Sequence, residues 1–154
     1  MSKASFVYVT YIRTTPEKLW QALTDPEFNR QYWRGAHQES EWKVGSPWKI
    51  VYDDGHVADA GEILEIEPLK RIVIRWRNEW SPEFKAEGYT RCTFDIEEAG
   101  EMMKLAIIHE AEAEGAYRFI TDGVSNGWPL ILSSLKSLLE TGKPLPKTDR
   151  PKGS

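Results

Sequence analysis

The feature that most constrains the fold is one long helical stripe that follows a run of short strands. Apolar residues recur at spacings of three and four from residue 117 to residue 138, the pattern of a helix that buries one face. Before it, residues 41–109 form short segments in which apolar and polar side chains alternate between turns. The strands share one apolar face, and this helix is the one long amphipathic element available to cover it. We therefore expect the helix to pack across a strongly curved sheet and to leave a hollow between them.

The strand segments favour an antiparallel meander. Asp53-Asp54-Gly55-His56 is a strong hairpin signal, and the short spacing between the other segments leaves no room for the crossover helices of a parallel sheet. Residues 77–88 are polar and predict a long loop. The predicted strands cover residues 5–13, 48–52, 61–67, 72–77, 91–96 and 103–109, which gives an α+β fold with six to seven strands.

Local signals place the starts of two helices and the end of a third. Thr15-Pro16-Glu17 and Asp25-Pro26-Glu27 each combine an N-cap residue, a proline at the first helical position and an acidic first turn, so two short helices follow the first strand. Gly142 is typical of a helix C-cap and ends the long helix. Pro129 removes the helical donor for the carbonyl of Ser125, so we expect a kink there. We predict one domain over residues 1–145 and a disordered, proline-rich tail over residues 146–154.

Composition excludes several classes of function. The chain has 154 residues and a net charge of −4 with interspersed signs, which argues against a nucleic-acid partner. Its one cysteine, Cys92, cannot form a disulfide framework, and neither a signal peptide nor a membrane-spanning stretch is recognisable. We expect a cytoplasmic protein. Three scattered histidines without metal-ligand spacing predict no metal site, and no cofactor motif is present.

Seven tryptophans are unusual for a chain of this length. Each indole buries about 150–250 Å² when it is enclosed, so most of them are expected in the core. Together they exceed what a core of this size normally uses, and some are therefore expected to line a cavity. The candidate ligand-binding residues are apolar or aromatic apart from one histidine: Trp33, Trp42, Trp48, Ile74, Trp76, His109, Val124 and Trp128.

Several segments resemble the family of the activator of the heat-shock-protein-90 ATPase. They are Thr15–Trp20 followed by Leu23–Pro26, the segment Gly61–Pro68, the strand that ends in Trp76, the pair Gly127-Trp128, and Leu135-Lys136 with Leu139-Glu140. The resemblance covers roughly residues 5–145, with the segments in the family's order. It implies the START-like helix-grip fold, which is similar to that of the birch-pollen allergen and whose members hold hydrophobic ligands between sheet and helix.

The resemblance leaves three functions open. The first is binding of a small hydrophobic molecule in the cavity. The second is a chaperone-associated or stress-associated interaction through the outer surface, with a chaperone as partner, and a homodimer is also open. The third is a cyclase-like or hydratase-like enzyme that uses the same cavity. The sequence favours a binding protein over an enzyme and assigns no catalytic residue.

His109 and Glu62 are the polar residues that an enzyme of this kind would use. His109 ends an apolar strand and faces the cavity if it shares the face of Leu105 and Ile107. Glu62 faces inward if it alternates in phase with Leu64 and Ile66, and an inward Glu–His pair could transfer protons. The alternatives are a histidine held by a local partner and a glutamate at a bulge or rim. We expect the cavity to exist and the pair not to form.

Overall fold

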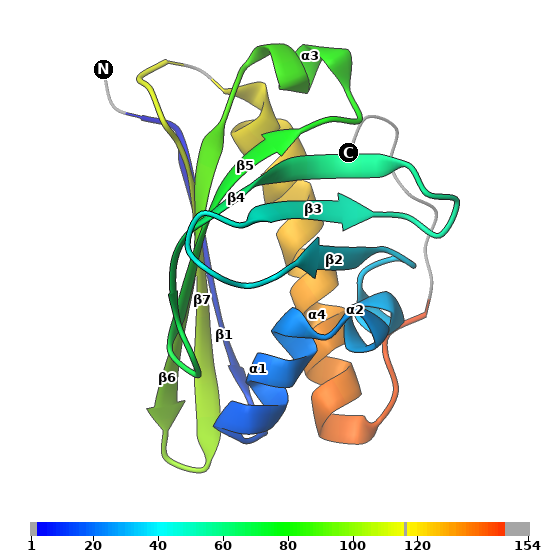
Figure 1. Ribbon diagram of the computed structural model, residues 1–154. Coiled ribbons are helices and arrows are strands. Elements are labelled where there is room, and N and C mark those ends of the chain that lie inside the picture. Colours follow the sequence, from blue (N-terminus) through cyan, green and yellow to red (C-terminus); the bar gives the residue numbers. More distant parts are fainter. Residues whose placement is uncertain (1–2, 116, 147–154) are drawn as a thin grey trace.

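The computed structural model describes residues 3–115 and 117–146, and its elements follow the order expected from the sequence (Figure 1). One strand comes first, then two short helices, then a run of strands and finally a long helix. The elements are β1 (Ser5–Ile12), α1 (Pro16–Thr24), α2 (Pro26–Tyr32), β2 (His37–Ser40), β3 (Pro47–Val51), β4 (Val57–Glu67), β5 (Arg71–Asn78), α3 (Pro82–Ala86), β6 (Thr90–Ala99), β7 (Met102–Ala111), the π-helix η1 (Phe119–Val124) and α4 (Ser125–Thr141).

Within the described residues the strands form one seven-stranded antiparallel sheet. Its order is β1-β7-β6-β5-β4-β3-β2, so β2 to β7 form a meander and the first strand joins the far edge beside the last one. The sheet curves around α4, while α1 and α2 lie beside one part of that helix (Figure 1). This is the α+β helix-grip arrangement that the sequence predicted.

Both short helices begin as the sequence predicted. The hydroxyl of Thr15 accepts a hydrogen bond from the backbone N–H of Lys18 at 3.2 Å, and Pro16 occupies the first turn of α1. The carboxylate of Asp25 accepts from the N–H of Glu27 at 2.9 Å at the start of α2. These caps satisfy backbone donors that a helix N-terminus would otherwise leave unpaired.

The core lies between the concave face of the sheet and α4. On β5 to β7 every second side chain points inward and is buried, as the alternating patterns predicted. Cys92 is one of these inward residues, and burial raises the pKa of its thiol, so it packs as a small apolar side chain. The inward residues of these strands are Ile72, Ile74, Trp76, Cys92, Phe94, Ile96, Met103, Leu105, Ile107 and His109.

The long helix is not uniform. It opens as the π-helix η1, becomes α-helical at Ser125 and ends at Gly142, whose φ of 85° and N–H···O bond to Leu138 form the expected C-cap. Pro129 lies in the first turns of α4, where its missing N–H withdraws a donor from the carbonyl of Ser125. We expected a kink at Pro129; the irregular backbone of this segment lies before it, in η1, and Pro129 itself is within the α-helical part.

Three segments differ from the sequence-based expectation. His37–Ser40 forms β2, which was too short and polar to show a strand pattern. Residues 82–86 form α3 inside the predicted long loop, with the hydroxyl of Ser81 accepting from the N–H of Phe84. The strand β4 begins at Val57, four residues before the predicted start. The predicted disordered tail lies almost wholly outside the described residues.

No helix in the described part of the chain is long and apolar enough to cross a membrane.

Candidate functional site

A pocket opens between the concave face of the sheet and the helical segment η1–α4. Its volume is about 80 Å³. The strands contribute its floor, the helices one wall, and the residues that follow α2 and β3 the opposite side. The lining residues are Trp33, Arg34, Ile50, Tyr52, Asp59, Trp76, Asn78, His109, Phe119, Gly123, Val124, Gly127, Trp128 and Ile131.

Five of the eight candidate residues meet at this pocket: Trp33, Trp76, His109, Val124 and Trp128. They come from α2's C-cap, β5, β7, η1 and α4. The ring of Trp128 stands edge-on to that of Trp33, with centroids 5.4 Å apart, and to that of Trp76, with centroids 5.7 Å apart. This edge-to-face geometry is favourable for aromatic rings and fixes their orientation.

The other three candidates, Trp42, Trp48 and Ile74, are not among the lining residues. Trp48 is buried beside Trp76, with ring centroids 4.4 Å apart, and its Nε1 donates to Gln38 Oε1 at 2.9 Å. Ile74 is fully buried in the core and Trp42 packs at its edge. Alternation placed Ile74 on the correct face, but position along the strand decides which inward residues reach the pocket.

His109 lies in the pocket wall, and both of its ring nitrogens are engaged. Trp128 Nε1, which can only donate, is 3.2 Å from His109 Nδ1, so Nδ1 is the acceptor and the ring proton is on Nε2. Nε2 donates to Thr90 Oγ1 at 2.8 Å, and the Thr90 hydroxyl donates to the carbonyl of Trp76 at 2.9 Å. Burial lowers the pKa of His109 to about 3, so the ring is neutral near pH 7.

Glu62 does not face His109. It pairs with Arg75 across the strands on the outer face of the sheet. The reason is a bulge in β4 after Ile63: the inward residues Ile63 and Ile66 are three positions apart, which breaks the simple alternation. The possibility that Glu62 alternates in phase with Leu64 and Ile66 and faces inward is therefore wrong. As expected, Glu62 and His109 do not form a pair.

The polar end of the pocket was not predicted from the sequence. Asp59 Oδ1 accepts from Trp76 Nε1 at 2.9 Å and from Asn78 Nδ2 at 3.2 Å, and both Asp59 and Asn78 are buried. Asn78 Oδ1 in turn accepts from the backbone N–H groups of Trp80 and Ser81. The sequence does hold a signal for Asp59. If the strand is extended back from residue 61, Asp59 falls at the same alternate positions as Gly61 and Ile63 and therefore on the inner face.

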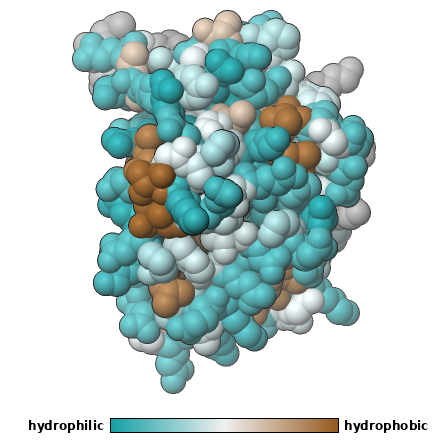
Figure 2. Space-filling view, viewed as in Figure 1, coloured by the Kyte–Doolittle hydropathy of each residue, from teal (hydrophilic) through white to brown (hydrophobic). Residues whose placement is uncertain are grey.

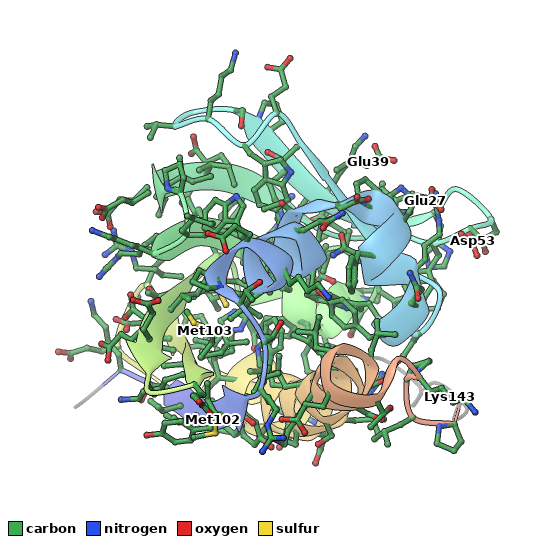
Figure 3. The ribbon with its side chains drawn as sticks, turned by 90° about the horizontal axis from the view of Figure 1, so that it is seen from below. Glu27, Glu39, Asp53, Met102, Met103 and Lys143 are labelled. Atoms are coloured by element: carbon green, nitrogen blue, oxygen red, sulfur yellow. The ribbon has the colours of Figure 1, made fainter. Side chains whose placement is uncertain are left out.

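The half-exposed lining residues mark the open side of the pocket. They are Arg34 and Tyr52 on one side and Gly123 and Gly127 on the helical side. Arg34 has a φ of 53°, a left-handed conformation in the turn between α2 and β2. Nearby, Arg30 forms an ion pair with Glu27 within α2 and another with Asp53, which ties α2 to the β3–β4 hairpin; Figure 3 shows Glu27 and Asp53 close together at the periphery.

The family comparison agrees with this architecture. A family model described as activator of Hsp90 ATPase homologue 1-like protein matches residues 13–140. A comparison with curated proteins gave no match.

Three solved structures illustrate the similarity of fold. Protein MLL2253 from Mesorhizobium loti is 26% identical, with a TM-score of 0.73 over 88% of this chain and 96% of that one. PFC0360w, an HSP90 activator from Plasmodium falciparum, is 23% identical, with a TM-score of 0.70 over 88% and 96%. The Aha1 dimer from Colwellia psychrerythraea is 21% identical, with a TM-score of 0.66 over 90% and 98%.

Proposed function

The chain belongs to the family of activator of Hsp90 ATPase homologue 1-like proteins, and we propose that its pocket binds a small hydrophobic molecule. The observation that carries the proposal is the set of rigid aromatic walls around an opening that the protein's own side chains leave unfilled. Trp76 and Trp128 are each fixed by an indole N–H hydrogen bond, to Asp59 and to His109. Walls that need no rearrangement lower the entropic cost of binding.

The size of the pocket limits the ligand. Sites for drug-sized molecules usually enclose about 300–1,000 Å³, and an apolar cavity of about 150 Å³ can hold benzene. The volume here is about 80 Å³ and the pocket is open on one side. The part of the ligand that enters is therefore only a few carbon atoms long, and the rest lies at the entrance.

The chemistry of the pocket favours binding over catalysis. A general base needs a free lone pair and a pKa near the working pH. His109 meets neither requirement, because Nδ1 already accepts from Trp128 and burial depresses the pKa to about 3. The acid that the enzymatic alternative required, Glu62, lies on the opposite face of the sheet.

The binding proposal can be tested by titration with cis-parinaric acid, a fluorescent fatty acid that accepts energy from tryptophan. The wild type is expected to bind it with saturable energy transfer. Ile131→Phe should abolish the signal, because the larger ring fills the pocket that Ile131 lines. Leu139→Phe, two turns further along α4 and away from the pocket, is the matched control and should bind normally.

Native mass spectrometry of protein from its own host would identify a retained molecule directly. Absence of saturable binding in the wild type would refute the proposal.

A second candidate function is an interaction with a chaperone. The family description and the HSP90 activator of P. falciparum support it. Figure 2 presents one face of the molecule as mostly hydrophilic with separate hydrophobic areas. An apolar row on the outer face of β1 is a candidate contact surface, because Val7, Val9 and Tyr11 are 57%, 43% and 45% exposed. The same edge strand is a candidate for self-association, which the Aha1 dimer supports.

This second function predicts a change in the ATPase rate of heat-shock protein 90 when the two proteins are mixed. Replacing Val7 and Val9 by serine should remove the effect, while Ile131→Phe should not. Light scattering on the same samples would report whether the serine variant also loses a dimer. The chaperone interaction assumes the cytoplasmic location expected from the sequence.

A further inference from the structure

Two glycines lie one helical turn apart on the wall of the pocket. Gly123 is in η1 and Gly127 is in α4, and both line the opening. Residues four apart share a helix face. Glycine is disfavoured inside helices because it has the most backbone freedom to lose and offers no side chain to pack. Each of these glycines therefore needs a physical reason.

Packing explains Gly123. A Cβ at this position would lie 3.2 Å from Phe84 Cε2 and 3.3 Å from Phe119 Cδ1, closer than most side chains tolerate. The rings of Phe84 and Phe119 pack together, with centroids 5.5 Å apart, and they hold α3 against η1. Gly123 thus allows this contact.

Packing does not explain Gly127. A Cβ built there meets no atom within 4 Å, and its φ lies outside the left-handed region that would require glycine. Neither a clash nor backbone strain excludes a side chain. Because Gly127 lines the pocket, its missing side chain leaves free space at the entrance.

We propose that Gly127 sets the width of the entrance and thereby restricts the ligand to a single unbranched alkyl or acyl chain; this inference rests on the binding function proposed above. The volume of about 80 Å³ is well below that of an enclosed apolar cavity of roughly 150 Å³, which can hold benzene. A chain can pass beside the backbone of Gly127 with its apolar end toward Trp76 and Trp128. Only the last few carbons of the chain enter, so the remainder of a long chain and its polar head lie outside, past Arg34 and Tyr52 on the open side of the pocket.

The test compares single substitutions on one helical turn by titration with cis-parinaric acid. Gly127→Ala places a methyl group in the entrance without a clash and should weaken binding at least tenfold. Asn126→Ala, at the exposed neighbouring position, is the matched control and should change affinity less than twofold. Both variants should keep or raise the thermal midpoint, because alanine is the better helix former. Gly127→Ser repeats the test with a second short side chain.

Competition against bound parinarate tests the ligand class. Dodecanoate should displace the probe at a concentration at least tenfold lower than adamantane-1-carboxylate, a compact cage that cannot pass the entrance. Equal affinity of Gly127→Ala and wild type, with unchanged folding, would overturn the role of Gly127 while leaving the binding function intact. Preference for the cage compound would overturn the chain-shaped ligand. A wild type that binds no probe would instead remove the binding function itself.

Discussion

At the residue scale, hydrogen bonding decides what the buried polar groups can do. The indole N–H of Trp128, the ring of His109 and the hydroxyl of Thr90 form a directed series that ends at the carbonyl of Trp76. Each group has a partner, which a buried polar group requires because an unpaired one costs about 1–3 kcal/mol. His109 therefore orients the indole of Trp128, which stands edge-on to that of Trp76, and through Thr90 it is linked to the backbone of Trp76.

The first prediction concerns the pH dependence of stability that His109 produces. Its pKa is about 3 in the folded state, against about 6.5 in an unfolded chain. Between these values the unfolded state binds more protons, so stability is complete above about pH 6.5 and falls as the pH drops toward 3. The slope from this one group is about 1.4 kcal/mol per pH unit. Urea unfolding of wild type and His109→Gln between pH 7 and pH 4 should differ by roughly that slope.

His56→Gln removes a half-exposed histidine and serves as the control for the loss of any histidine. Parallel stability curves for the wild type and His109→Gln would mean that His109 takes up its proton in the folded state as readily as in the unfolded one.

At the element scale, α4 depends on one buried stripe. Leu135 is fully buried, whereas the neighbouring Lys136 is partly exposed and donates from Nζ to the carbonyl of Tyr11 and to Glu140. Leu135→Ala should lower the free energy of unfolding by about 2–5 kcal/mol, because it leaves a cavity in the core. Lys136→Ala should cost less than about 1 kcal/mol, as expected for an exposed ion pair. Chemical denaturation measures both, and similar losses would contradict the assigned helix phase.

A second element-scale prediction concerns the contact between α3 and η1. The carboxylate of Glu87 accepts from the backbone N–H groups of Arg118 and Phe119, both at 2.9 Å, and so caps the N-terminus of η1. Glu87→Ala should cost about 0.5–2 kcal/mol, typical of a lost cap. Hydrogen exchange should accelerate at the amides of Arg118 and Phe119. Glu83→Ala, which removes only an exposed ion pair to Arg118, should leave these amides protected.

At the scale of the whole molecule, the residues that follow α4 fold back and form hydrogen bonds with that helix. After α4, the carbonyl of Lys143 accepts from Ser137 Oγ at 2.7 Å, and the N–H of Leu145 donates to Ser134 Oγ at 3.1 Å. We predict that deleting residues 147–154 leaves the thermal midpoint nearly unchanged, whereas deleting residues 143–154 lowers it, because the second deletion removes both bonds. Differential scanning calorimetry on the two truncated chains tests this. A large loss from the shorter deletion would mean that the tail packs on the fold.

The sequence by itself determined the elements whose signals are local. The caps at Thr15 and Asp25, the hairpin around Gly55, the end of α4 at Gly142 and the alternating face of β5 all follow from neighbouring residues, and the helix-grip fold follows because one amphipathic helix had to cover one apolar sheet face. The same packing argument predicted a hollow at that interface, and the family resemblance added the expectation that it holds a hydrophobic ligand.

Only the tertiary structure decided which inward residues reach the pocket. Trp48 and Trp76 are both buried and their rings are in contact, but Trp76 lines the pocket and Trp48 does not. The bulge after Ile63 turned Glu62 outward, and bulges have no reliable local signature because they depend on the pairing of two strands. The space beside Gly127 is likewise invisible in the sequence, because an empty volume depends on atoms from β3, β5, β7 and α4 that meet only in the folded chain.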